Sequence, residues 1–148
     1  MAITQVSLVS VWVKDLEESL SFYTDILGFE LGEDVRLGED FRWLTVTHPA
    51  QPGLSLHLTT PGPPLSEELV TSINRALDAG AMPGVGLAVD DCRATYEDLR
   101  GKGVTFLAEP AERPYGVEAL MRDNSGNWLV MVESRAFDPS AMTRDDLA

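Results

Sequence analysis

Residues 6–31 read VSLVSVWVKDLEESLSFYTDILGFEL, and this stretch decides the fold because it combines a strand, a helix and the start of another strand. Every second residue from Val9 to Val13 is a valine, which is the period of a strand with one buried face. Asp15 follows, with a glutamate three residues later, as in a helix-capping box. Apolar side chains then recur at spacings of three and four until a glycine. We therefore expect a helix over residues 16–27.

The same pattern returns about half a chain length later. Residues 85–89 predict a strand, Asp91 predicts the next helix cap, and residues 92–100 predict the helix that follows. Two glycines then precede a short apolar segment that is typical of another strand. When the two halves are superposed, Asp91 takes the place of Asp15. The sequence therefore predicts two tandem modules of similar construction.

The remaining segments complete both modules. Further strands are expected at residues 41–47, 54–59, 117–122 and 128–133, and a helix at residues 66–79. The polar segment 33–38 predicts a hairpin connection, and residues 109–116, with two prolines, predict a loop. The expected fold is α+β, with two βαβββ modules forming a cupped, mostly antiparallel sheet. The expected division is a first module at 1–62, a connecting helix at 63–82, a second module at 83–134 and a flexible tail at 135–148.

Composition narrows the choice of partner and compartment. Eleven Lys and Arg residues against 24 Asp and Glu residues give a net charge of −13, which repels nucleic acid. This acidity serves solubility, or it steers a cationic small molecule. No apolar run is long enough to span a membrane, the N-terminus lacks a secretory pattern, and a single cysteine fits a reducing compartment. We expect a cytoplasmic protein that binds neither nucleic acid nor membrane.

Three segments resemble one known family. They are VWVKDLEESLSFYTDILGFEL at 11–31, VGLAVDDCRATYEDLRGKGVTF at 85–106 and RDNSGNWLVMVE at 122–133. Together they resemble the vicinal oxygen chelate superfamily, which contains glyoxalase I, extradiol dioxygenases, fosfomycin-resistance enzymes and bleomycin-binding resistance proteins. The resemblance covers about residues 5 to 134. It implies paired βαβββ modules that hold a metal or a small ligand, and it implies a homodimer.

The resemblance also indicates where a metal would be held. In the family the ligands, usually His, Glu or Gln, come from the first and last strands of each module. In this sequence the matching positions are Leu8, His57, Gly84 and Val130. A divalent transition metal needs three or more converging N, O or S donors, and only one of these four side chains offers one. The expectation is no metal ligand set and no cofactor.

Residues two positions along each strand share a face with the matched positions. They combine small residues with tryptophans, as expected for an apolar cleft that accepts an aromatic or cationic organic molecule. Arg122 is a further candidate, because the resemblance implies that it lies near the rim of the family's pocket. The candidate ligand-binding residues are Ser10, Trp12, Ser55, His57, Thr59, Gly86, Arg122, Trp128 and Val130. Each has a structural alternative: a core tryptophan, a sheet histidine, a packing glycine or an exposed arginine.

Three functions are compatible with these features. The favoured hypothesis is a metal-independent protein that sequesters an antibiotic or other natural product, without catalytic residues. The alternative is an enzyme of the lyase, isomerase or dioxygenase type, with unconventional metal ligands or with His57 as a base. A module that binds another protein is the third.

Overall fold

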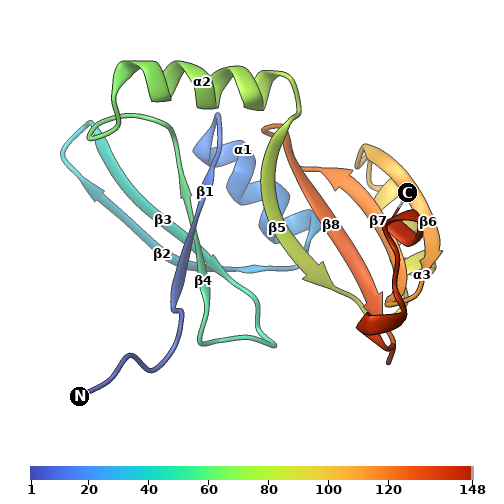
Figure 1. Ribbon diagram of the computed structural model, residues 1–148. Helices are drawn as coiled ribbons and strands as arrows, with labels where there is room; N and C mark the ends of the chain where they lie inside the picture. The colour runs from blue at the N-terminus through green and yellow to red at the C-terminus, as the bar shows by residue number, and fades with distance from the viewer. Residues whose placement is uncertain (148) are drawn as a thin grey trace. The chain divides into compact units, whose positions relative to one another are not determined.

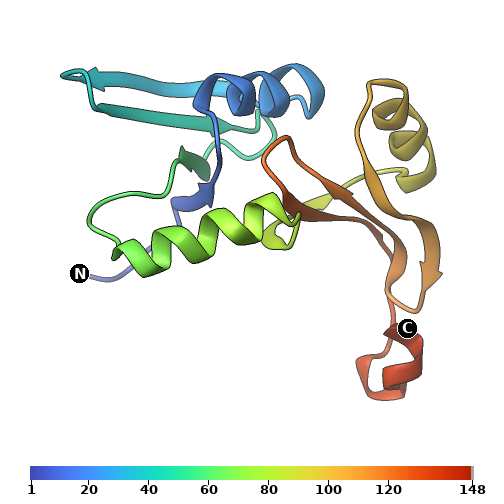
Figure 2. The same ribbon diagram turned by 90° about the horizontal axis from the view of Figure 1, so that it is seen from above.

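The computed structural model describes residues 1–147. The chain divides into two compact units. The first comprises Met1–Met82 and the turn Asn124–Asn127, and the second comprises Pro83–Asp123 and the residues from Trp128 onward. Within the described residues the strands form two four-stranded sheets, one for each unit (Figure 1, Figure 2). No helix in residues 1–147 is both long and apolar enough to cross a membrane.

The first unit has the order strand, helix, three strands, followed by a second helix. Its elements are β1 (Leu8–Trp12), α1 (Leu16–Ser21), a π-helical turn (Phe22–Ile26), β2 (Glu30–Leu37), β3 (Phe41–Thr47), β4 (Ser55–Thr59) and α2 (Glu67–Asp78). Across the sheet the strands lie in the order β1-β4-β3-β2. The β1 strand runs parallel to β4, and the other neighbours are antiparallel. The α1 helix contacts β4.

The second unit repeats this order. Its elements are β5 (Met82–Ala88), α3 (Cys92–Gly101), β6 (Phe106–Arg113), β7 (Gly116–Arg122) and β8 (Asn127–Ser134). The strand order is β5-β8-β7-β6, and α3 contacts β6 and β7 (Figure 1). Two short 3-10 helices follow at Pro139–Ala141 and Arg144–Leu147. The predicted α+β class with two βαβββ repeats is confirmed.

Both predicted helix caps are present. The side chain of Asp15 accepts a hydrogen bond from the backbone N–H of Glu18 at 2.9 Å, and Asp91 accepts one from Ala94 at 3.0 Å. Each bond satisfies an N–H group that has no partner within the helix. The repeated strand-to-helix junction is therefore specified locally in both halves.

The helix predicted over residues 16–27 differs in its second half. From Phe22 the backbone widens into a π-helical turn, in which the N–H of Leu27 donates to the carbonyl of Phe22 at 3.1 Å. The hydroxyl of Thr24 also donates to the carbonyl of Leu20 at 2.7 Å. The wider turn leaves the adjacent aromatic residues Phe22 and Tyr23 both buried. Periodicity alone does not reveal this change of pitch.

Two segments expected to be irregular are strands. Residues 33–37 of the predicted connection lie in β2, and residues 109–113 of the predicted loop lie in β6. Gly38 and the pair Pro114 and Tyr115 lie in the turns that follow these strands. Both are edge strands, where polar residues and proline are tolerated because one side needs no pairing. Each pairing also shifts register, between Leu31 and Asp34 in β2 and around Pro110 in β6. Such bulges interrupt the alternation of apolar and polar residues from which a strand is predicted.

Each sheet has one face packed beneath a helix and one face without such cover. On the helix side of the first sheet the buried side chains are Val11, Leu44, Val46, Leu56 and Leu58, and on that of the second they are Val117, Ala119, Met121, Leu129 and Met131. We call the opposite side of each sheet its open face. The open faces carry the alternate residues of the same strands.

Candidate functional site

The open face of the first sheet gathers five of the predicted ligand-binding residues. In the parallel pairing of β1 with β4, Ser10 lies beside His57 and Trp12 lies beside Thr59. Ser55 precedes His57 by two positions and therefore shares its face. All but Ser10, which is exposed, are half-buried. The structure thus brings these five side chains to one surface.

A further aromatic residue on this face was not predicted. The ring of Trp43 stacks on His57, with centroids 4.1 Å apart and planes inclined by 25°. Trp43 lies on β3, opposite in direction to the buried Leu44 and Val46. Alternation along the predicted strand at 41–47 places Trp43 and Leu44 on opposite faces. The sequence does not show which of these two faces is the open one.

The open face of the first sheet carries few polar groups that are free to bind a charged ligand. Burial lowers the pKa of His57, which keeps the imidazole neutral at pH 7. The hydroxyls of Thr47 and Ser55 lie 2.9 Å apart and bond to each other. A neutral imidazole next to an indole can accept or donate one hydrogen bond while also offering a flat surface. This arrangement suits an aromatic molecule better than a charged one.

The open face of the second sheet gathers the other four predicted residues. Arg122 and Trp128 are directly paired between β7 and β8, and the next pair on this face is Leu120 with Val130. Gly86 lies against Val130, because a Cβ atom built on Gly86 would be 3.2 Å from a methyl carbon of Val130. A larger residue at position 86 would press on this surface. This face is therefore apolar around Leu120, Val130 and Gly86, between Arg122 at one end and Glu118 at the other.

The residues at the four positions that match the family's metal ligands could not hold a metal ion. Of the four matched positions, Leu8, Gly84 and Val130 carry no donor atom, and His57 alone supplies one. Within residues 1–147 no three His, Cys, Asp or Glu side chains gather in a way that could hold an ion.

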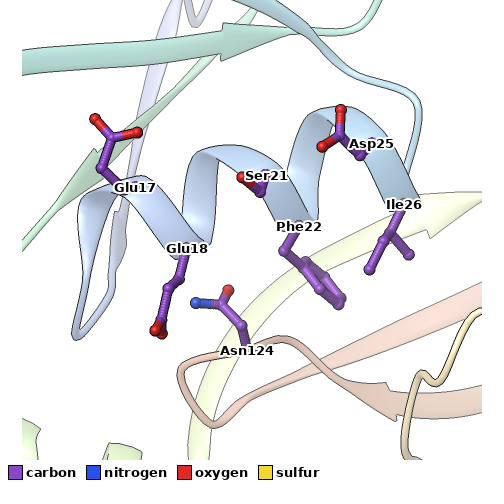
Figure 3. A pocket seen from close by; sticks show the side chains of 7 residues that line it. All are labelled: Glu17, Glu18, Ser21, Phe22, Asp25, Ile26 and Asn124. Carbon is purple, nitrogen blue, oxygen red and sulfur yellow. The ribbon is translucent and has the colours of Figure 1, made fainter.

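A separate hollow of about 440 Å³ lies beside α1 in the first unit (Figure 3). It is lined by Glu17, Glu18, Ser21, Phe22, Asp25, Ile26 and Asn124. The carboxylate of Glu17 already pairs with Arg42 and Arg36. None of the nine predicted ligand-binding residues lines this hollow, which belongs to the helix side rather than to the open face.

Comparison with known sequences gives a match over most of the chain. Residues 5–131 match the Glyoxalase/Bleomycin resistance protein/Dioxygenase superfamily. The YurT protein of Bacillus subtilis (strain 168) is 32% identical over 130 residues, which is 87% of this chain and 98% of YurT.

Solved structures of similar fold include two with substantial sequence identity. UcmS2 is 40% identical, with a TM-score of 0.82, and the match covers 90% of this chain and 100% of UcmS2. TnmS3, described as an antibiotic binding protein from Streptomyces sp. CB03234, is 30% identical with a TM-score of 0.71, and the match covers 91% of this chain and 99% of TnmS3. The predicted fold is thereby confirmed.

Proposed function

Because the chain belongs to the Glyoxalase/Bleomycin resistance protein/Dioxygenase superfamily, we propose that it is a metal-independent protein that binds and sequesters a small organic molecule, such as an antibiotic or other natural product. The observation that carries this proposal is the donor set: Leu8, Gly84 and Val130 stand where metal-binding relatives would place ligands. A protein without that set can still bind an organic molecule through shape and stacking.

The open faces support an aromatic ligand. Trp43 stacked on His57 on one sheet, and Trp128 on the other, offer broad ring surfaces. Gly86 keeps the surface around Val130 low. The similarity to TnmS3, which is described as an antibiotic binding protein, favours the same class of ligand.

We propose in addition that the protein is a homodimer and lies in the cytoplasm, and exposed apolar residues on the first open face support the homodimer. Val35 and Leu37 of β2 and Phe41 of β3 are 42%, 63% and 49% exposed. These side chains adjoin one another, because Leu37 pairs with Phe41 and Val35 is two positions away on the same face, and such a contiguous apolar patch is typical of an interaction surface. Light scattering after size-exclusion chromatography tests this part, and a mass of one chain would contradict it.

The experiment for the binding function uses purified protein treated with a chelator. We expect the treated protein to keep its circular dichroism spectrum and to bind an aromatic natural product from a screened panel, with quenching of tryptophan fluorescence. The variant Trp43→Phe should lose part of the quenching, because its indole lies on the open face. A stoichiometric transition metal in the protein as isolated, or unchanged fluorescence throughout the panel, would contradict the proposal.

One observation favours an enzyme as the second candidate. The neutral imidazole of His57 lies on the open face, where it could accept a proton from a bound substrate. Such a role requires turnover of a bound molecule that His57→Gln abolishes while leaving binding intact. Recovery of every bound compound unchanged would exclude this alternative.

A further inference from the structure

We propose that Arg122 determines ligand specificity on the open face of the second sheet, by binding an acidic oxygen group, a carboxylate or phenolate, carried by a flat apolar molecule. This inference rests on the proposed function and deepens it, because it names the chemical class that the face selects. Arg122 acts here as a binding residue, and no chemical step is assigned to it.

The position of Arg122 follows from strand alternation. Its neighbour Met121 is fully buried on the helix side of β7, so Arg122 belongs to the open face. It is paired with Trp128 across the antiparallel ladder. Side chains paired in this way lie about 5 Å apart at their Cβ atoms, within reach of one shared ligand.

The side chain of Arg122 has a buried nitrogen atom without a hydrogen-bond partner among the residues that the structure describes. Its Nε–H group is buried and donates no hydrogen bond within residues 1–147, and none of the ion pairs in that part of the chain includes Arg122. By contrast, Arg42 is paired with Asp34 and with Glu17. A buried charged donor without an acceptor is costly, and a ligand oxygen would remove that cost.

The nearest acidic residue on the same strand face is already occupied. Glu118, two alternate positions before Arg122 on β7, accepts a hydrogen bond from the hydroxyl of Tyr115 at 2.5 Å and pairs with Arg113 at 3.5 Å. Burial and this hydrogen bond raise the pKa of Tyr115 to about 12, so the phenol remains a donor. Glu118 is therefore already paired with Tyr115 and Arg113, and no ion pair within residues 1–147 joins it to Arg122.

The surroundings define the rest of the ligand. Trp128 lies opposite Arg122, the pair Leu120 and Val130 follows on the same face, and Gly86 leaves the space beside Val130 without a side chain. A flat aromatic ring fits this apolar surface. The planar guanidinium presents parallel N–H groups that match two carboxylate oxygens.

The proposed ligand differs from the cationic molecule that the net charge led us to expect. The net charge of −13 attracts cations only at long range. At physiological salt such attraction is screened over about 8 Å. A desolvated arginine in direct contact therefore outweighs the overall charge in selecting the bound group.

The test uses three probes with the same ring system: 9-anthracenecarboxylate, 9-anthracenemethanol and protonated 9-(aminomethyl)anthracene. Affinities are measured by calorimetry at pH 7 for the full chain. We expect the carboxylate to bind most tightly. Arg122→Met should weaken its binding by about tenfold or more, leave the alcohol within about twofold, and leave the amine unchanged or bound more tightly.

Two further variants separate binding from folding. Arg122→Lys keeps the charge but loses the planar pair of donors, and should give a smaller loss for the carboxylate. Arg75→Met, which removes an exposed positive charge from α2, should change no affinity. Because the Arg122 Nε has no partner within the part of the chain that the structure describes, unliganded Arg122→Met should keep or raise its melting temperature.

The outcomes are distinguishable. Carboxylate binding that survives Arg122→Met would overturn this inference and leave the proposed function standing. An equal loss for all three probes together with a lower melting temperature would assign Arg122 a structural role, and would also overturn it. Failure of the wild-type chain to bind any of the probes would count against both the proposed function and this inference.

Discussion

The side-chain amide of Asn127 donates a hydrogen bond to the backbone carbonyl of Trp12 at 2.8 Å, across 115 residues of sequence. The same turn makes two more contacts with the junction between β1 and α1. The backbone N–H of Lys14 donates to the hydroxyl of Ser125 at 3.0 Å, and the amide of Asn124 donates to the hydroxyl of Ser19 at 3.0 Å. The turn therefore holds the end of β1, on which the candidate residue Trp12 lies.

Loss of the Asn127 side chain should destabilise the protein. Asn127 is 1% exposed, so Asn127→Ala leaves the carbonyl of Trp12 without its donor in a place that water does not reach. We expect the free energy of unfolding to fall by about 1–3 kcal/mol in urea denaturation. Asn74→Ala on the exposed side of α2 is the control, and should change it by less than about 0.5 kcal/mol. Equal stability of the two variants would contradict the role of Asn127.

Gly126 in the same turn should accept no larger residue. Its φ angle is +105°, and an added Cβ atom would lie 1.9 Å from the carbonyl oxygen of Leu77. Gly126→Ala should therefore cost about 3 kcal/mol or more, from backbone strain and from the clash with a helix end. Gly101→Ala is the matched control, because Gly101 ends α3 and nothing lies within 4 Å of its added Cβ atom. That variant should be neutral or more stable by up to about 1 kcal/mol. Thermal unfolding of both variants decides the matter.

The ion pair between Arg42 and Asp34 should make stability depend on acid pH. Arg42 donates to both oxygens of Asp34 at 2.9 and 2.8 Å, and this contact lowers the pKa of Asp34 below its ordinary value of 3.8. A lowered carboxyl pKa adds stability that is present above pH 3.8 and is lost as the pH falls through the folded-state pKa. Arg42→Met should therefore be less stable than the wild type at pH 7, with the difference shrinking in acid. A constant difference from pH 7 to pH 2 would rule out this explanation.

His57 should make the stability of the protein depend on pH in a second window, at higher pH. Burial holds its pKa below the ordinary value of 6.5, so the unfolded chain binds more protons than the folded chain as the pH falls from 6.5 through the folded-state pKa. The wild type should lose stability in this window relative to His57→Gln. His48→Gln, which leaves His57 in place, should retain the loss. Urea denaturation at pH 8, 6.5 and 5 measures this loss of stability. If the free energy of unfolding changed equally with pH in the wild type and in His57→Gln, the prediction would be wrong.

Local chemistry in the sequence determined the repeated module. The caps at Asp15 and Asp91 and the alternation along β3 and β8 specify their elements with contacts of short range, so they could be predicted without the tertiary structure. The predicted ligand-binding residues follow from the family resemblance together with strand alternation, and the structure places them on the two open faces.

Tertiary contacts decided the rest. The polar β2 and the proline-containing β6 become strands because a neighbour pairs with one edge of each, which no local pattern shows. The stacking of Trp43 on His57 depends on the register of two strands. Whether the Nε of Arg122 finds a partner among the described residues depends on which side chains the fold places around it. Sequence thus determines which side chains share a face, whereas only the packed structure decides which of them remain available to a ligand, because availability depends on every neighbour brought there by the fold.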